Sequence, residues 1–420
     1  MNRAREFVRN HGPLLAILML AAVLRCIGLT WGIPTAGVPH RPLHYDENTV
    51  MGVMRQFDLA RHDFNPESAH LEGPLAFYAW EGAAVILRTF GVLDKMPNHF
   101  TGYDDPDYFR MMLAGRFVMV LFDLASLLLI YLILWRIAQR GAALLGALLF
   151  AIIPFEIIHC HFMRPHIAGN FFVCLIILLA FRVHETKRPT LLAVLSGLAI
   201  GLAVATRYHL FALALIPYTA MVYHAAIIAP GQRSLLAWFK AAVQPRVWLL
   251  AACAAAGFCI SDPYLFLDFE AARASMTSQA NATAFTQFGW PGIFDLTRPW
   301  RYLVWVLPAG TALLWIIFYA SAAYCILTRE YRRYVAPLLI FLLIYVFYST
   351  KGYGLYCIRV LLHIFPILVI WSALALGHAW NALRDRTIPR AILAAGVTFI
   401  ILATIFFDLA YVTAMARRAS

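Results

Sequence analysis

Two adjacent carboxylates, Asp46 and Glu47, stand in the short stretch HYDENTV, residues 44–50. A carboxylate that lies beside a substrate can take the proton of an attacking hydroxyl group. Asp46 is therefore a candidate general base, and Glu47 is a candidate that orients the acceptor or fixes the loop. The competing interpretation is that both residues only begin a helix, where the helix dipole favours acidic side chains.

Cationic side chains that could hold an anion recur at the ends of several apolar runs. Guanidinium, ammonium and imidazolium groups bind phosphate, and a helix bundle can bring distant helix ends together. For each residue alone, the alternative is a side chain that reaches from the hydrocarbon region to the membrane surface. The candidate phosphate ligands are Arg164, His166, Arg207, Lys351 and Arg359.

Three histidines in HCHFMRPH raise the question of a metal site. Histidine is a common metal ligand, but the spacing of His159, His161 and His166 fits no standard zinc motif. Hydrogen-bonded histidines without a metal are the favoured interpretation. The sequence thus predicts no cofactor with certainty and leaves a divalent cation open.

The composition is that of a membrane protein. Of the 420 residues, 62% are hydrophobic and 13% are charged, whereas an ordinary soluble domain has about 25% charged residues. Apolar runs of membrane-spanning length recur along the chain. We expect one membrane domain, residues 1-420. Its first apolar run is expected to be a retained membrane helix and not a cleaved signal peptide. The expected spans are 13-30, 112-135, 141-158, 167-183, 190-206, 209-229, 247-261, 302-327, 334-349, 359-378 and 391-412.

The distribution of charge predicts the orientation of these spans. The net charge of +12 is carried in short basic clusters between apolar runs, as expected of cytoplasmic loops and not of a nucleic-acid surface. This threading leaves two long extracytoplasmic loops, 31-111 and 262-301. In the first loop, 47-61 and 74-93 are expected to be interfacial helices. The second of these could instead cross the bilayer.

One carboxylate, Asp123, falls well inside an expected span. A charge in that position is costly, so it must be paired, protonated or beside a cavity. An arginine from a neighbouring helix and a proton relay are equally compatible with the sequence.

Several segments, in order, resemble one known superfamily. LAAVLRCIGLTWGIP, HYDENTVMGVMRQF and FNPESAHLEGPLAFYAW resemble the opening of the polyprenyl-phosphate-sugar-dependent glycosyltransferases. These form the GT-C superfamily, which includes protein O-mannosyltransferases and aminoarabinose transferases. The resemblance covers most of residues 15-375. Later blocks that resemble it are GRFVMVLFDLASLLLIYLI, HFMRPHIAGNFFVCLIILLAFR, GLAIGLAVATRYHLFALALIP, SDPYLFLDFEA and IRVLLHIFPILVIW.

This resemblance implies a fold and an activity. The implied fold is an all-α GT-C-like bundle of about eleven transmembrane helices with interfacial helices in the first extracytoplasmic loop. The implied activity is inverting transfer of a hexosyl or pentosyl group from a polyprenyl-phosphate donor to a lipid, glycan or protein. Asp46 would act as general base or bind the acceptor. Arg207 and Arg359 match basic positions of the family and would bind the donor phosphate.

The sequence departs from the family pattern in places that bear on the acceptor and on metal. His166 follows Pro165 where many relatives carry an acidic residue, which argues against a divalent metal. The chain ends after its last span, so we expect acceptor recognition by the membrane domain or by a partner. The candidates for acceptor binding or support of the site are His44, His70, Glu72 and Tyr208.

The resemblance also implies a location, and two other functions stay open. We expect a multi-pass protein of the bacterial cytoplasmic membrane with its active site on the extracytoplasmic side. A transporter or lipid flippase would use Asp123 and the glycines and prolines within spans as a pathway, although such proteins commonly show paired repeats. A non-catalytic component of a glycan-assembly complex is the second alternative.

Overall fold

The computed structural model describes residues 2–34, 45–66, 73–228, 234–282, 296–350 and 358–419. These residues form helices and turns, and one isolated β-bridge joins Asp58 to Asp63. Within these ranges, eight helices are long and apolar enough to cross a membrane, and a bent pair would make a ninth. His11–Cys26 and Leu314–Leu327 are shorter apolar helices, so the expected number of eleven spans is not confirmed.

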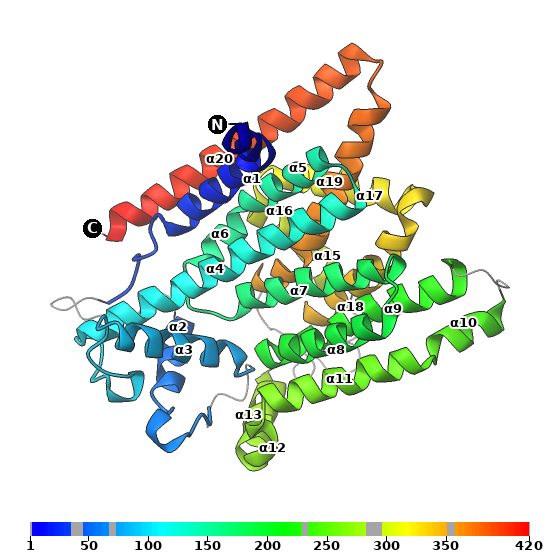
Figure 1. The fold of residues 1–420 in the computed structure, drawn as a ribbon. Helices are drawn as coiled ribbons and strands as arrows, with labels where there is room; N and C mark the ends of the chain where they lie inside the picture. Colours follow the sequence, from blue (N-terminus) through cyan, green and yellow to red (C-terminus); the bar gives the residue numbers. More distant parts are fainter. Residues whose placement is uncertain are drawn as a thin grey trace.

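The first half of the chain places two short helices beside a long one. The α2 and α3 helices lie across the end of α4 (Figure 1). At 15 residues, α3 is not among the candidate spans, which agrees with an interfacial helix. The elements are α1 (Asn2–Cys26), α2 (Tyr45–Met54), η1 (Leu59–Arg61), α3 (Leu75–Thr89), η2 (Pro97–His99), α4 (Pro106–Ile137), α5 (Arg140–Ala151), α6 (Pro154–Cys160) and α7 (His166–Phe181).

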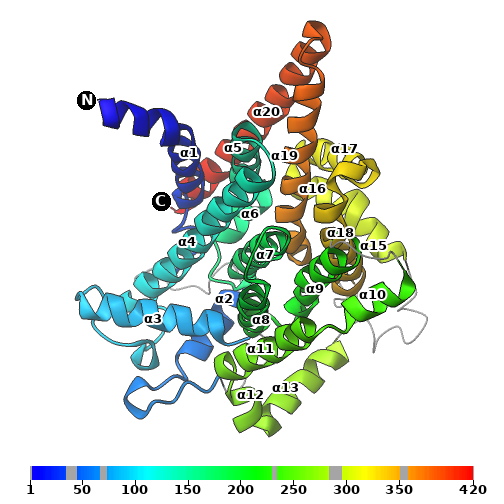
Figure 2. The ribbon, with the colours of Figure 1, turned by 45° about the vertical axis from the view of Figure 1, so that its right-hand side comes forward.

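The second half completes the bundle, and the C-terminal α20 runs beside α1 at one side of it (Figures 1 and 2). Its elements are η3 (Arg182–His184), α8 (Pro189–Thr206), η4 (Tyr208–Ala214), α9 (Leu215–Tyr223), η5 (His224–Ile228), α10 (Leu235–Ala242), α11 (Pro245–Ser261), α12 (Tyr264–Leu267), α13 (Phe269–Ala282), α15 (Thr297–Arg301), η6 (Tyr302–Val306), α16 (Leu307–Thr311), α17 (Leu314–Leu327), η7 (Arg329–Tyr331), α18 (Arg332–Ser349), η8 (Ile358–Ile364), α19 (Phe365–Ala382) and α20 (Thr387–Ala419).

Two expected spans are interrupted where the sequence carries proline or a strained residue. The expected span 141-158 bends by 56° between α5 and α6, and Pro154 begins the second piece. The expected span 302-327 is wrong as one helix, because Ala312 has a φ of +48° between α16 and α17. Proline removes a ladder hydrogen bond, and a left-handed φ ends a right-handed helix.

Helices α8 and α11 pack closely because glycine lines their contact. A Cβ atom at Gly197 would lie 2.5 Å from the backbone oxygen of Leu250, and one at Gly201 the same distance from that of Ala254. Small residues let helix backbones approach within a membrane domain. This packing fixes the end of α8, where Arg207 follows.

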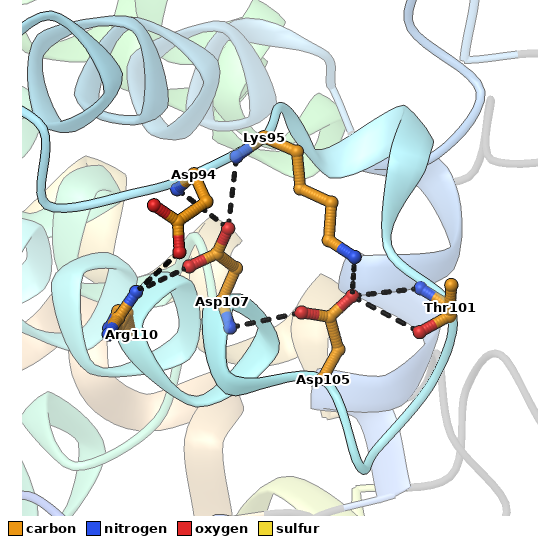
Figure 3. A network of polar contacts seen from close by, with 6 residues as sticks. All are labelled: Asp94, Lys95, Thr101, Asp105, Asp107 and Arg110. Carbon is orange, nitrogen blue, oxygen red and sulfur yellow. Dashed lines mark hydrogen bonds and ion pairs between the residues drawn. The ribbon is translucent and has the colours of Figure 1, made fainter.

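A polar network fixes the loop before α4, as Figure 3 shows. Asp105, the N-cap of α4, accepts hydrogen bonds from Asp107 N at 3.1 Å and Thr101 N at 3.0 Å, and its Oδ2 lies 2.7 Å from Lys95 Nζ. Asp107 accepts from the backbone N–H groups of Asp94 and Lys95. Burial alone would raise the pKa of Asp105, but the hydrogen bonds from Lys95, Thr101 and Asp107 outweigh it and lower the pKa.

We expect Asp105→Ala to lower the free energy of unfolding by about 1–3 kcal/mol, because the cap and its donors lose their acceptor. A carboxyl group with a lowered pKa in the folded state stabilises above its unfolded pKa, and this stability disappears as pH falls through the folded pKa. Denaturant unfolding in detergent at neutral pH and near pH 3 should therefore show a difference between wild type and variant that shrinks in acid. Asp94→Ala, whose side chain is 84% exposed, is the control, and an equal loss in both variants would contradict the assignment.

Candidate active site

Asp46 lies in the first turn of α2 and contacts arginines from two distant segments. Its Oδ2 is 2.5 Å from Nη1 of Arg359 in η8 and 3.4 Å from Nη2 of Arg164, which lies between α6 and α7. The side chains of Asp46, Arg359 and Arg164 are 27%, 25% and 9% exposed. The structure therefore brings the candidate base together with two of the candidate phosphate ligands.

Arg207 joins this group through His166. Arg207 follows the last residue of α8, and its extended φ and ψ of −154° and 122° turn the chain into η4. Its guanidinium group contacts the ring of His166, the first residue of α7. His166 also lies within electrostatic range of Arg164 and Arg359. We call Arg164, Arg207 and Arg359 the arginine cluster.

Two side chains of the arginine cluster are largely buried, and this burial limits the kinds of ligand that the cluster can bind. Arg164 is 8% exposed and Arg207 is 7% exposed. Arg359 and Arg164 contact one carboxylate, that of Asp46, and Arg207 contacts His166 beside them. Buried cations are stable only when anions and hydrogen-bond acceptors balance them. A phosphate group with its several acceptor oxygens has the complementary charge and geometry.

Glu47, the next residue of α2, is fully buried and has other partners than Asp46. Its two oxygens accept hydrogen bonds from Nε and Nη2 of Arg116 at 2.9 and 2.6 Å. Oε1 also accepts from the backbone N–H of Met163 at 2.7 Å. Nη1 of Arg116 donates to the carbonyl oxygens of Leu29 and Trp31, each at 2.7 Å. This pair thus joins α2, α4, the chain after α1 and the segment that carries Arg164.

The geometry of Glu47 favours the expectation that it fixes the loop. Successive residues of an α-helix point about 100° apart, so Asp46 can face the arginine cluster while Glu47 enters the interior. Gly115 makes room for this arrangement, since a Cβ atom there would lie 2.4 Å from Sδ of Met163. These contacts favour Glu47 as a candidate positioning residue for Asp46.

Of the remaining residues predicted to bind acceptor or phosphate, the structure describes Tyr208. Tyr208 donates a hydrogen bond of 2.9 Å to Oδ2 of Asp262, so it ties η4 to the end of α11. Asp262 is fully buried, and burial raises its pKa. His44, His70, Glu72 and Lys351, which were predicted to bind acceptor or phosphate, lie outside the described residues.

The histidines are held by protein groups. Both ring nitrogens of His161 lie within 2.8 Å of backbone carbonyl oxygens, those of Ile157 and Ile27. Nδ1 of His159 lies 2.9 Å from the carbonyl oxygen of Phe155, and its ring stacks on that of His166. Among the residues that the structure describes, no group of three His, Cys, Asp or Glu side chains could hold a metal ion. The described donors around Asp46 are cationic and do not fit a divalent cation.

Asp123 has the structural partner that was one of its two interpretations. Its carboxylate is paired with Arg25 of α1, and both side chains are fully buried. Nη1 of Arg25 also donates to the carbonyl oxygen of Ala151 at 2.8 Å. The pair therefore links α1, α4 and α5.

Sequence reasoning missed two sets of residues that support the site. Arg116 was not selected, although an arginine inside an apolar span must find an acidic partner. The second set is the hydrogen-bonded chain of His363, Asn170 and Glu156, which ties η8, the segment that carries Arg359, to α7 and α6. Nδ1 of His363 lies 2.7 Å from Oδ1 of Asn170, and Nδ2 of Asn170 donates to Glu156 at 2.6 Å. A polar residue inside the apolar run of α7 was the available signal for Asn170.

Comparison with known proteins identifies what this chain is similar to. Residues 110–258 match the model of a family described as dolichyl-phosphate-mannose-protein mannosyltransferase. No curated protein matches the chain. The resemblance to the GT-C superfamily that the sequence predicted is thus supported by a match over part of the chain.

Solved structures share the fold at low sequence identity. Archaeoglobus fulgidus oligosaccharyltransferase, solved with zinc and sulfate, has a TM-score of 0.55 and 17% identity, over 94% of this chain and 52% of that one. The oligosaccharyltransferase AglB of the same organism, solved with an inhibitory peptide and a dolichol-phosphate, has a TM-score of 0.55 and 16% identity, over 98% and 56%. This chain spans about half the length of these proteins.

ArnT from Cupriavidus metallidurans, solved with undecaprenyl phosphate, has a TM-score of 0.57 and 14% identity, over 97% of this chain and 69% of that one. Together with the two oligosaccharyltransferases, it confirms the predicted fold class, an all-helical membrane bundle of the GT-C type.

Proposed function

We propose that this chain, which has the GT-C fold, is an inverting membrane glycosyltransferase. It would move a sugar from a polyprenyl-phosphate donor to a lipid, glycan or protein. The observation that carries the proposal is the contact of Asp46 with Arg359 and Arg164 beside Arg207 and His166. A proton acceptor and an anion-binding cluster are the two groups that such a transfer requires.

The proposed reaction is one displacement at the anomeric carbon. A hydroxyl oxygen of the acceptor attacks that carbon while the bond to the phosphate oxygen breaks. Asp46 takes the hydroxyl proton, and the bonding electrons leave with the polyprenyl phosphate. The arginine cluster stabilises the charge that develops on this phosphate. Attack from the face opposite the leaving group inverts the configuration.

The contact between Asp46 and Arg359 suggests how donor binding and base activation are linked. A carboxylate held by two guanidinium groups is a weak proton acceptor, because the positive charges stabilise its ionised form. A donor phosphate would compete for the same guanidinium groups. In this scheme the donor displaces Asp46 from Arg359 and leaves its carboxylate able to accept a proton.

Location and orientation belong to the same proposal. The candidate spans support a multi-pass membrane protein, and we place it in the bacterial cytoplasmic membrane. The basic loops support the placement of the end that carries Asp46 on the extracytoplasmic side. A polyprenyl chain would lie along the apolar helices while its phosphate reaches the arginine cluster. The single membrane domain, residues 1-420, is likewise part of this proposal.

Sugar transfer by the purified protein tests the proposal. Protein in lipid nanodiscs is supplied with polyprenyl-phosphate donors that carry different hexoses or pentoses, together with lipid and glycan acceptors. We expect release of polyprenyl phosphate and a glycosylated product by mass spectrometry. Movement of the donor across the membrane without transfer would favour the transporter alternative. The ion pair of Asp123 with Arg25 gives this residue a structural role that needs no transport pathway.

A further inference from the structure

A cavity lies between α3, the chain from η1 to Phe64, and the junction of α11 and α12. Its volume is about 460 Å³, and both ribbon views place α3 beside this junction (Figures 1 and 2). Hydrogen bonds hold the walls together, from Phe64 N to Tyr264 Oη at 3.1 Å and from Asn65 Nδ2 to Asp268 Oδ2 at 2.8 Å. We call it the α3 cavity. Its lining residues are Leu59, Phe64, Tyr78, Glu81, Gly82, Val85, Ile260, Pro263 and Tyr264.

Tyr78 and Glu81, which line the α3 cavity, each have a buried side-chain oxygen with no hydrogen-bond partner among the residues that the structure describes. Glu81 is 3% exposed, and its Oε2 is buried without a donor. The hydroxyl group of Tyr78, one helical turn earlier, is also buried and unpartnered. Buried polar atoms are almost always hydrogen-bonded in folded proteins. These two oxygens therefore indicate a ligand group that can donate hydrogen bonds.

The residues that line the α3 cavity indicate the charge of the ligand group. Burial raises the pKa of Glu81 to about 7, which is the response of a carboxyl group without a compensating cation. Among the described residues that line the α3 cavity, none is lysine or arginine. A positively charged donor is the complement of this site. A primary ammonium group has three N–H donors, whereas a quaternary ammonium group has none.

The surface next to the cavity indicates the rest of the ligand. Ile260 and Leu267 are 79% and 77% exposed, and Phe266 is 54% exposed. Exposed apolar side chains at a membrane surface are expected to face acyl chains. A ligand whose cationic head enters the cavity would thus lay its apolar part on α11 and α12.

We propose that the α3 cavity binds a lipid with a primary amine in its headgroup, with Glu81 as its ionic partner and Tyr78 as a hydrogen-bond partner. The aromatic rings of Phe64, Tyr78 and Tyr264 surround the headgroup. Neither Asp46 nor a residue of the arginine cluster is among the described residues that line this cavity, and the proposal does not depend on the transferase activity.

Lipid titration by native mass spectrometry of the full chain in detergent tests this site. The probes are phosphatidylethanolamine and phosphatidylcholine with identical acyl chains, which differ in the N–H donors of the head. We expect the wild type to bind phosphatidylethanolamine about tenfold more tightly, because a charge-assisted hydrogen bond to a buried group is lost with the other lipid. Glu81→Gln should abolish this preference, and Tyr78→Phe should reduce it.

Glu270→Gln is the matched control, since this glutamate is exposed on the neighbouring α13. It should leave the preference unchanged, and thermal unfolding should show that each variant is folded. Equal binding of the two lipids by the wild type would overturn the proposal even if Glu81→Gln did not fold. A folded Glu81→Gln protein that kept the preference would also overturn it.

Discussion

Replacing Asp46 with asparagine is expected to lower sugar transfer by about 10²- to 10⁴-fold, which is the usual contribution of a general base. The amide has nearly the same shape but cannot take the acceptor proton. Binding of polyprenyl phosphate should stay intact or become stronger, because Asp46 no longer competes for Arg359 and Arg164. Turnover in nanodiscs and titration with polyprenyl phosphate measure the two effects separately.

A matched control for this variant is available in the same loop. Asp94→Asn changes an 84% exposed carboxylate and should leave both measurements unchanged. Equal turnover by wild type and Asp46→Asn would remove the assignment of Asp46 as the base. A loss of polyprenyl-phosphate binding in Asp46→Asn would instead show that the carboxylate supports the phosphate site, contrary to the competition proposed here.

Glu47→Gln is expected to destabilise the protein by about 3–5 kcal/mol, the usual cost of breaking a buried ion pair by removing one partner. The substitution leaves the guanidinium group of Arg116 buried without its anion. Activity should fall with the folded fraction, because the loop that carries Asp46 loses its anchor. Denaturant unfolding in detergent and turnover per folded molecule measure these effects.

Two further variants separate a positioning role for Glu47 from a catalytic one. Glu185→Gln breaks the ion pair with Arg136, in which the side chain of Arg136 is 45% exposed and that of Glu185 is 39% exposed. It should lower the free energy of unfolding by about 0–1 kcal/mol. Adding Arg116→Met to Glu47→Gln removes the unpaired charge and should restore part of the stability. A Glu47→Gln protein of normal stability with little turnover per folded molecule would contradict the positioning role.

The helices were predictable where apolar length alone decides them. The long apolar runs at α4, α7 and α20 appear as candidate spans in the structure. Local breaks were not predictable in the same way. The expected span 302-327 contains a left-handed residue at Ala312, and no residue type at that position signals such a φ. Backbone strain of this kind depends on tertiary packing.

The candidate site was predictable in its residue types more than in its contacts. Asp46 was selected as one of two adjacent carboxylates in the first outer loop, and Arg164 and Arg359 were selected as cations at the outer ends of expected spans; the structure joins the three. The partner of Glu47 was missed, because a sequence does not show which buried arginine faces which carboxylate. The cavity beside Glu81 was missed for the same reason, since its walls come from α3, η1 and α11.

The most direct test of the central claim is the position of the phosphate in an experimental structure of the protein with polyprenyl phosphate. We predict phosphate oxygens within hydrogen-bond distance of Arg359 and Arg164, and an Asp46 carboxylate that has left Arg359 and faces the acceptor side. A phosphate bound away from the arginine cluster, with the contact between Asp46 and Arg359 intact, would contradict the account.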